Sequence, residues 1–486
     1  MKEKRVRTRY APSPTGSMHI GNLRSALYEY LIAKSQGGDF ILRIEDTDQS
    51  RLVEGAIEKI YDTLKLAGIQ HDEGPDVGGD YGPYVQSQRK DLYLPYALEL
   101  VEKKQAYYCF CDKERLEELR KSQGHEGVKY DRHCLSLSDE EIKANLEAKV
   151  PFVIRQKMPQ EGSVTYEDAV FGTITVPCSE LEDQILIKSD GFPTYNFANV
   201  IDDHLMKITH VVRGSEYVSS TPKYILLYEA FGWDVPVFVH LPLITKEGGR
   251  KMSKREGDAS FMDLVEKGYL PEAIVNYVAL LGWSPRDNRE IFSLQELAEA
   301  FDISGISKSP SVFDMEKLNW MNREYIRKLD MDSFHAKALP WYEKAGLYET
   351  NIDLSKVSKL LIERVEYFEQ IPEMVDFLIK MPEDYDLNMF AHKKMKTTVE
   401  NSVGFLEESL KALEPIEDWN VQTIEQALMD TVQRLGVKNG QILWPVRTAI
   451  SGKQSTPGGA FEIADLLGKE ETLSRMRISL NRLKNL

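Results

Sequence analysis

Residues 9–22 read RYAPSPTGSMHIGN, and this stretch decides the fold of the first part of the chain. It follows a short run with strand character at 6–10. It precedes a predicted amphipathic helix whose apolar face would hold Leu23, Leu27, Tyr30 and Leu31. A strand, a turn and a helix N-terminus suit an anion, because free backbone N–H groups and the positive end of the helix dipole point into the turn. The plainer interpretation is an ordinary turn with a surface histidine, His19.

A second distinctive stretch lies far down the chain, where residues 248–255 read GGRKMSKR. Turn glycines lead into a dense cationic loop. Such a loop can bring positive charge to a phosphate that develops negative charge during group transfer. Taken alone, a cluster of lysine and arginine is more often a solvated face, so the interpretation depends on the pair of stretches together.

The two stretches together resemble the signature pair of class I aminoacyl-tRNA synthetases. HIGN at 19–22 is similar to the HIGH motif of that class, and KMSKR at 251–255 is similar to its KMSKS motif. Asn22 and Arg255 are the departures. With RIEDTD at 43–48, the chain resembles the glutamyl/glutaminyl branch, and within it the bacterial-type glutamyl-tRNA synthetases, over nearly its whole length.

The resemblance implies ATP-dependent ligation of L-glutamate to the 3' end of tRNA(Glu) through a glutamyl-adenylate, with release of AMP and pyrophosphate. ATP, glutamate and tRNA(Glu) would be the partners, and Mg²⁺ would accompany the phosphates. The family expectation is a monomer in the cytoplasm with no membrane partner. Two alternatives stay open: a catalytically silent tRNA-binding or regulatory protein, and a nondiscriminating enzyme that also charges tRNA(Gln).

By the same resemblance, site roles fall on positions that match the family motifs. His19, Lys254 and Lys251 would be catalytic, with Lys251 the weaker candidate for direct phosphate contact. The ATP-binding residues would be Pro12, Thr15, Gly16, His19, Gly21, Asn22, Lys251, Met252, Ser253, Lys254 and Arg255. The glutamate-binding residues would be Arg9, Ser13, Glu45, Tyr195, Asn199 and Arg213. Arginine suits a carboxylate because its planar fork donates two parallel hydrogen bonds.

Three closely spaced cysteines indicate a possible zinc site. Zinc in structural sites takes four ligands in a tetrahedron. The thiols are Cys109, Cys111 and Cys134, and the fourth ligand is open between Tyr130, His133, His125 and a residue outside this segment. Some relatives carry the Cys-x-Cys and Tyr-x-x-x-Cys spacing seen here, which favours Tyr130. The alternative is a set of ordinary reduced cysteines.

Secondary-structure signals predict an α/β part followed by an all-helical part. A strand at 40–44 and a helix at 52–67 extend the opening stretch into a parallel pair, with ligands expected at the carboxyl ends of the strands. After residue 322 strand signals nearly vanish. Helical spacing is expected at Leu361, Val365 and Phe368, and again along Ile424, Leu428, Val432 and Leu435.

These signals and the resemblance together predict a Rossmann-type parallel-sheet catalytic domain with an inserted acceptor-stem-binding domain and a helical anticodon-binding region. The predicted bounds are 1–88 with 201–248 for the catalytic domain, 89–200 for the insertion, and 249–322 for the KMSKR loop and a helical stem-contact domain. The anticodon-binding region is predicted at 323–486, either as one domain or as two subdomains split near 382. The runs at 437–447 and 456–459 resemble the anticodon-binding region of the bacterial enzymes.

Composition narrows the function classes. A chain of 486 residues predicts about three domains by the usual domain size. The net charge of −16 argues against a protein that coats nucleic acid nonspecifically, so tRNA recognition would rest on shape and specific contacts. The sequence shows neither an apolar run long enough to span a bilayer nor a secretory signal, which favours a cytoplasmic protein.

Overall fold

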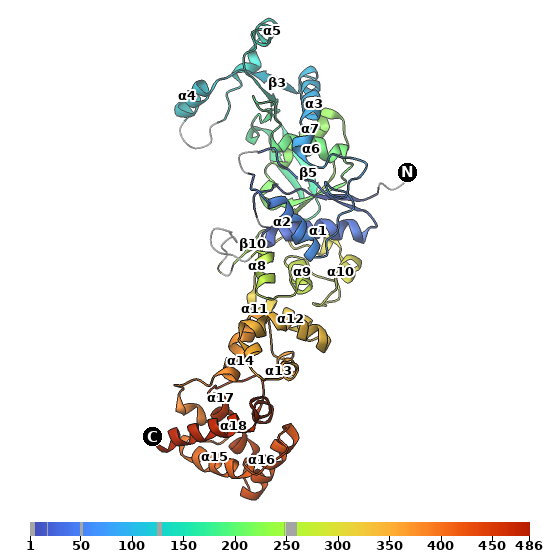
Figure 1. The fold of residues 1–486 in the computed structure, drawn as a ribbon. Helices are drawn as coiled ribbons and strands as arrows, with labels where there is room; N and C mark the ends of the chain where they lie inside the picture. Colours follow the sequence, from blue (N-terminus) through green and yellow to red (C-terminus); the bar gives the residue numbers. More distant parts are fainter. Residues whose placement is uncertain (1–4, 17, 49–51, 124–128, 247, 249–259) are drawn as a thin grey trace. The chain divides into compact units, whose positions relative to one another are not determined.

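The computed structural model describes residues 5–16, 18–48, 52–123, 129–246, 248 and 260–486. The chain divides into two compact units, one formed by residues 1–265 and 271–315 and the other by residues 266–270 and 316–486 (Figure 1). The first unit contains the sheets and the second is helical, so the predicted combination of an α/β part and an all-α part is confirmed. The finer division into four domains stays a prediction.

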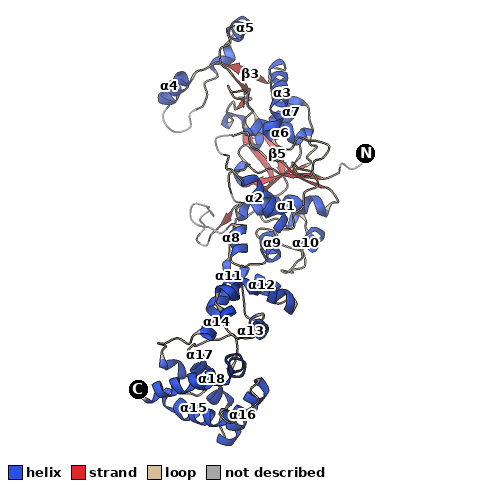
Figure 2. Ribbon diagram, in the orientation of Figure 1, coloured by secondary structure: helices blue, strands red, loops and turns tan. Residues whose placement is uncertain are grey.

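Parallel strands form the centre of the first unit. Its elements are β1 (Arg7–Tyr10), α1 (Ile20–Ser35), β2 (Asp39–Leu42), α2 (Ala56–Leu66), α6 (Tyr195–Leu205), β8 (His210–Gly214), α7 (Thr221–Phe231) and β9 (Val237–Leu241). Strand β1 pairs in parallel with β2, and β8 pairs in parallel with β9. The Thr209 N–H donates to the Arg7 carbonyl at 2.9 Å, which brings β8 beside β1. Figure 2 shows the strands between α1 and α2 on one side and α6 and α7 on the other.

Helix α1 differs from the amphipathic helix that its sequence predicts. Its buried residues lie on nearly all sides and include Ala26, Tyr28 and Ile32. Leu23, Leu27 and Leu31 of the predicted apolar face are also buried, whereas Tyr30 is only half-buried. The reason is that α1 packs on the sheet and also against α9 (Pro271–Ala279) and α10 (Leu294–Ala300). The Tyr28 hydroxyl donates to the Ala279 carbonyl at 3.0 Å on that second side.

Helix α2 begins at Ala56, four residues later than predicted. Gly55 directly precedes the helix and has a left-handed backbone conformation, with φ of 74°. This conformation is not that of a right-handed helix, so the helix starts only after Gly55. Leu52 and Val53 therefore lie outside the helix and are exposed.

The segment predicted as an insertion contains strands that belong to two different sheets. Its elements are α3 (Lys90–Glu102), β3 (Ala106–Cys109), α4 (Lys113–Gln123), α5 (Asp139–Glu147), β4 (Val153–Gln156), β5 (Ser163–Asp168), β6 (Gly172–Pro177) and β7 (Ile185–Ile187). Strands β3, β4 and β7 form an antiparallel sheet. The β5–β6 hairpin extends the catalytic sheet instead, because β5 pairs in parallel with β9 through Asp168 and Phe238. The insertion is thus continuous with the strands that carry the site.

The last segment of the first unit is mainly helical, as predicted, but it contains a short strand that the sequence does not signal. Helix α8 (Phe261–Glu266) precedes α9 and α10, and β10 (Ile244–Thr245) pairs in parallel with β11 (Ser311–Val312). Two residues are too few for a hydrophobic pattern, so the partner of β10 becomes visible only in three dimensions.

The second unit contains no β-strand in residues 316–486, all of which are described (Figure 2). Its helices are α11 (Met315–Ile326), α12 (Met331–Lys344), α13 (Leu354–Leu361), α14 (Ile371–Ile379), α15 (Val399–Leu413), α16 (Val421–Leu435), α17 (Asn439–Ser451) and α18 (Ala460–Lys484). Helix α16 carries the predicted apolar residues. None of the described helices combines the length and apolar composition that crossing a membrane requires.

One helix prediction in this unit was wrong. Val365 and Phe368 do not continue the helix of Leu361, because α13 ends at Leu361 and Phe368 begins a separate short 3-10 helix, Phe368–Gln370. Both side chains are nevertheless buried. Their spacing therefore reflects burial in the same hydrophobic core and not one continuous helix.

Candidate active site

A cavity of about 350 Å³ lies at the carboxyl ends of β1 and β8. These are the strand ends at which parallel α/β sheets bind ligands. It brings together residues predicted for ATP with residues predicted for glutamate. The predicted residues that line it are Arg9, Pro12, Ser13, Thr15, His19, Gly21, Asn22, Tyr195 and Arg213. Gly16, Glu45 and Asn199 are not among its lining residues, although Asn199 and Glu45 contact side chains close to it, as described below.

His19 is the N-cap of α1, and its side chain shapes one wall of the cavity. Its Nδ1 accepts hydrogen bonds from the Gly21 N–H at 3.0 Å and the Asn22 N–H at 3.4 Å. A Cβ atom on Gly21 would lie only 2.9 Å from His19 Cε1, so a glycine is needed for this cap. A ring that accepts at Nδ1 carries its proton on Nε2, where it is a donor. The exposed imidazole therefore stands at the helix N-terminus, the part of the turn that favours an anion.

Arg213 lines this cavity, and two of its donor nitrogens are unpaired. Its Nη2 donates to Asn199 Oδ1 at 3.4 Å, and the Asn199 amide in turn donates to the Tyr195 carbonyl at 2.8 Å. The guanidinium lies 5.0 Å from the ring centroids of both Tyr217 and Tyr224. Its Nε and Nη1 have no hydrogen-bond partner among the described residues, although the side chain is buried. Buried donors are normally paired, so the two unpaired nitrogens and the positive charge of Arg213 suit an anionic ligand such as a carboxylate.

Arg9 is more heavily engaged than Arg213. Its Nε donates to Asp203 Oδ1 at 2.9 Å, and its Nη1 lies 3.4 Å from both Glu29 Oε1 and the Val212 carbonyl. Arg9 is therefore positioned by protein groups on several sides while still lining the cavity.

A buried network of charges continues from Arg9. Arg43 is fully buried and donates to Asp203 Oδ1 and to Glu45 Oε1, both at 2.8 Å. Burial opposes ionisation of Asp203, but Arg9 and Arg43 outweigh it and hold the pKa of this carboxyl below its usual value. Burial prevails at Glu45, and it raises the pKa of that carboxyl despite Arg43. Glu45 Oε2 has no partner within the described ranges.

Three members of this network were not predicted as site residues: Glu29, Arg43 and Asp203. Arg43 belongs to the RIEDTD stretch, so the motif itself could have drawn attention to it. Asp203 lies four residues after Asn199 on α6, and this helical spacing was the only available signal. The predicted residues Lys251, Met252, Ser253, Lys254 and Arg255 lie outside the described residues.

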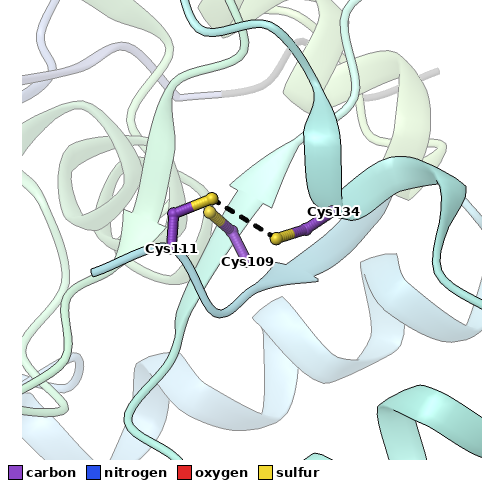
Figure 3. A group of neighbouring side chains, drawn as sticks. All are labelled: Cys109, Cys111 and Cys134. Atoms are coloured by element: carbon purple, nitrogen blue, oxygen red, sulfur yellow. Dashed lines mark hydrogen bonds between the residues drawn. The ribbon is translucent and has the colours of Figure 1, made fainter. Parts of the chain in front are cut away.

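The three predicted thiols form a compact cluster (Figure 3). The sulfur atoms of Cys109, Cys111 and Cys134 all lie within 4.8 Å of one another, and those of Cys111 and Cys134 are 3.5 Å apart. The Tyr130 hydroxyl lies 3.3 Å from the sulfurs of both Cys109 and Cys111. His133 is exposed and does not join the cluster. His125, the other alternative, lies outside the described residues.

The two C-terminal runs predicted for anticodon binding meet through one side chain. Arg447 on α17 donates to Thr456 Oγ1 at 3.0 Å and to the Gln454 carbonyl at 2.8 Å. Its guanidinium lies 4.3 Å from the Trp444 ring centroid, and the Trp444 indole N–H donates to the Met389 carbonyl at 2.8 Å. Arg447 thus ties the helix to the loop that precedes α18.

Comparison with known families accounts for this arrangement. Residues 5–320 match the model described as tRNA synthetases class I (E and Q), catalytic domain. The chain belongs to this class I synthetase family. Residues 333–480 match a second model, described as an anticodon binding domain, so the helical unit of the synthetase agrees with the predicted region.

Curated relatives and solved structures agree with the family models over full length. The chain is 59% identical to the glutamate–tRNA ligase of Clostridium tetani, covering 100% of this chain and 99% of the relative. It is 60% identical to that of Clostridium botulinum, covering 99% of each. Its fold is similar to the crystal structure of a glutamate tRNA ligase from Elizabethkingia meningosepticum in complex with its amino acid, with a TM-score of 0.87 and 37% identity over 99% of this chain and 100% of that one.

Proposed function

We propose that this synthetase ligates L-glutamate to the 3' end of tRNA(Glu) through a glutamyl-adenylate. The observation that carries the proposal is Arg213, a buried arginine of the cavity wall with two unpaired donor nitrogens, whose positive charge suits the side-chain carboxylate of glutamate. The glutamate–tRNA ligase names of the full-length relatives support it. Arg9, Ser13, Tyr195 and Asn199 would complete the glutamate pocket, and Glu45 would face the ammonium group.

In the first step, a carboxylate oxygen of glutamate attacks the α-phosphorus of ATP and the bond to pyrophosphate breaks. In the second, a hydroxyl of the terminal ribose of tRNA attacks the acyl carbon and AMP leaves. Neither step needs a side-chain nucleophile, so the protein acts by positioning and by stabilising charge. The N-terminus of α1 and His19 would hold the phosphates, with Lys254, and more weakly Lys251, contributing positive charge. Mg²⁺ would arrive on the phosphate oxygens of ATP and neutralise part of their charge.

The other parts of the chain would bind the tRNA. The insertion would contact the acceptor stem, residues 249–322 would supply the KMSKR loop and further stem contacts, and the helical unit would read the anticodon. The reaction is assigned to the cytoplasm, where the four free cysteines would stay reduced. A monomer is expected, as in the family that the chain resembles.

Charging assays with purified tRNA(Glu) and tRNA(Gln) test this function. We expect labelled glutamate, and not labelled glutamine, to be attached to tRNA(Glu) in an ATP-dependent reaction. Attachment of glutamate to both tRNAs would identify a nondiscriminating enzyme. Charging with glutamine would contradict the assignment of Arg213 to a carboxylate, and no charging by folded protein would favour a silent tRNA-binding protein.

A structural zinc ion is proposed at the thiol cluster. Four ligands at the usual Zn–S distance of about 2.3 Å lie about 3.8 Å apart in a tetrahedron. The cluster has this scale, with sulfur atoms 3.5 Å apart at one edge and none more than 4.8 Å from another. Cys109, Cys111 and Cys134 would hold the ion, with Tyr130 as the fourth ligand. The zinc would tie β3 to the turn around Cys134 within the insertion.

Replacing Cys111 by serine is expected to abolish stoichiometric zinc binding. Zinc binding contributes directly to folding free energy in small metal sites, so the melting temperature should also fall by several degrees. Elemental analysis of purified protein measures the zinc content. Cys178→Ser is the control, because Cys178 is buried within the same unit but outside the cluster, and it should retain the zinc. Wild-type protein purified without zinc, and unable to bind it on addition, would contradict the proposal. Tyr130→Phe with unchanged zinc affinity would remove Tyr130 from the ligand set.

A further inference from the structure

Glu29 places a carboxyl group in the wall of the cavity that we assign to glutamate. It lies on α1, is only 2% exposed, and is one of the residues that line the cavity. Its Oε1 is 3.4 Å from Arg9 Nη1, which is a long contact for an ion pair. Its Oε2 has no hydrogen-bond partner among the residues that the structure describes. The proposed reaction assigns no role to this group.

The surroundings of Glu29 contain both cationic and anionic groups. The charge of Glu29 interacts with groups from four parts of the chain: Arg9 and Tyr10 of β1, Arg213 of β8, Arg43 directly after β2, and Asp203 of α6. Burial raises the pKa of the Glu29 carboxyl well above its ordinary value, although Arg9 and Arg213 oppose the shift, and the charge of Asp203 adds to it. Arg9 and Arg213 therefore interact with Glu29 and also line the cavity, and the burial of Glu29 favours its protonated form.

We propose that the Glu29 carboxylate competes with the substrate for these arginines. When the side-chain carboxylate of glutamate enters between Arg9 and Arg213, Glu29 takes up one proton from solvent. The inference rests on the proposed glutamate pocket. The substrate keeps its charge, and the proton forms a new O–H bond on Glu29.

The physical reason is repulsion between like charges at low dielectric. Two carboxylates that share one buried site do not both stay ionised, because the repulsion favours protonation of one of them. A protonated Glu29 can donate its O–H to the substrate carboxylate, so the repulsion is replaced by a charge-assisted hydrogen bond. Because Oε2 has no hydrogen-bond partner among the described residues and Glu29 belongs to the cavity wall, a proton on Oε2 displaces no existing partner.

Proton uptake makes glutamate affinity depend on pH in a defined direction. Glu29 is charged above its raised pKa, and only the protonated form admits the substrate without repulsion. The apparent KM for glutamate should therefore rise with pH, by up to about tenfold per pH unit for a single linked proton. This rise should occur above the pKa of Glu29 in the free enzyme. The KM for ATP should lack this dependence, because ATP does not compete with Glu29 for the two arginines.

Glu29→Gln isolates this effect, since its neutral amide has the shape of the carboxyl group and keeps an N–H donor. We would measure KM for glutamate and for ATP between pH 6.5 and 9 in tRNA charging. At the alkaline end, the glutamate KM of the variant should be about tenfold below that of the wild type. The reason is that one linked proton changes the wild-type KM by up to about tenfold per pH unit, and the variant lacks this proton. The glutamate KM of the variant should not change with pH. Glu147→Gln removes a charge from an exposed residue that does not line the cavity, and it should follow the wild-type profile.

A Glu29→Gln profile parallel to the wild type, or a glutamate KM raised by this substitution at all pH values, would overturn the inference. If the variant does not fold, the wild-type profile decides alone, because a glutamate KM that does not rise with pH relative to the ATP KM is incompatible with proton uptake. Arg213→Ala separates this failure from that of the proposed function. An unchanged glutamate KM in Arg213→Ala would contradict the proposed glutamate pocket itself. A raised glutamate KM in Arg213→Ala would support the pocket, so that only the role proposed for Glu29 would be wrong.

Discussion

Replacing Arg213 by alanine is expected to raise the KM for glutamate by a factor of at least about 30. Truncating one partner of a buried, hydrogen-bonded charge pair typically costs about 2–5 kcal/mol, and each 1.4 kcal/mol is tenfold. The two unpaired donor nitrogens, Nε and Nη1, would be lost together with the positive charge. The KM for ATP should change by less than about threefold, because the phosphates are assigned to the N-terminus of α1. Steady-state charging assays with each substrate varied in turn measure both values.

Two further variants define what Arg213 contributes. Arg213→Lys keeps a positive charge but loses the planar fork, so its glutamate KM should lie between those of the wild type and Arg213→Ala. Arg286→Ala is the control, because the Arg286 side chain is 83% exposed and pairs with Asp302 away from the cavity wall. An Arg213→Ala enzyme that folds and binds glutamate as the wild type does would remove Arg213 from the pocket.

The sequence predicts the position of the cavity because the information is local. A strand of four residues, a turn with Pro12 and Gly16, and a helix N-terminus follow one another directly, and each has its own residue preferences. The carboxyl end of a parallel strand is a place where ligands bind, so Arg9 and Arg213 could be assigned from their strand-end positions and their motifs. The same holds for the thiols, whose spacing alone predicted a cluster.

The remaining site residues could not be predicted because their partners are distant in sequence. Arg43 and Asp203 are 160 positions apart, and nothing in either neighbourhood marks a contact between them. Glu29 has the sequence context of a solvent-facing residue on a helix, since acidic residues are rarely buried. Its burial becomes visible only when α1 is packed on the sheet and covered by α9 and α10. The same packing explains why the predicted amphipathic pattern of α1 was wrong.

Asp203 is expected to be a main determinant of stability in the first unit. Its Oδ1 accepts from Arg9 at 2.9 Å and from Arg43 at 2.8 Å, and all three side chains are at most 3% exposed. Asp203→Ala would leave two buried guanidinium groups without this carboxylate. Breaking a buried pair by removing one partner costs about 3–5 kcal/mol of unfolding free energy, because an uncompensated charge remains. The urea-induced unfolding transition of the first unit, followed by circular dichroism, measures the loss.

The pH dependence of this loss distinguishes charge pairing from simple packing. Because Arg9 and Arg43 overcome burial and depress the pKa of Asp203 below its ordinary value of 3.8, its stabilising contribution is fully present above that value and disappears as pH falls through the lower folded-state pKa. The difference between wild type and Asp203→Ala should therefore be constant from pH 6 to 8 and should shrink only in strong acid. Glu147→Ala is the matched control, because Glu147 and its partner Lys143 are 69% and 77% exposed, and it should cost less than about 1 kcal/mol. A loss for Asp203→Ala as small as that of the control would show that Arg9 and Arg43 do not depend on this carboxylate, and a loss that is unchanged in strong acid would attribute it to packing.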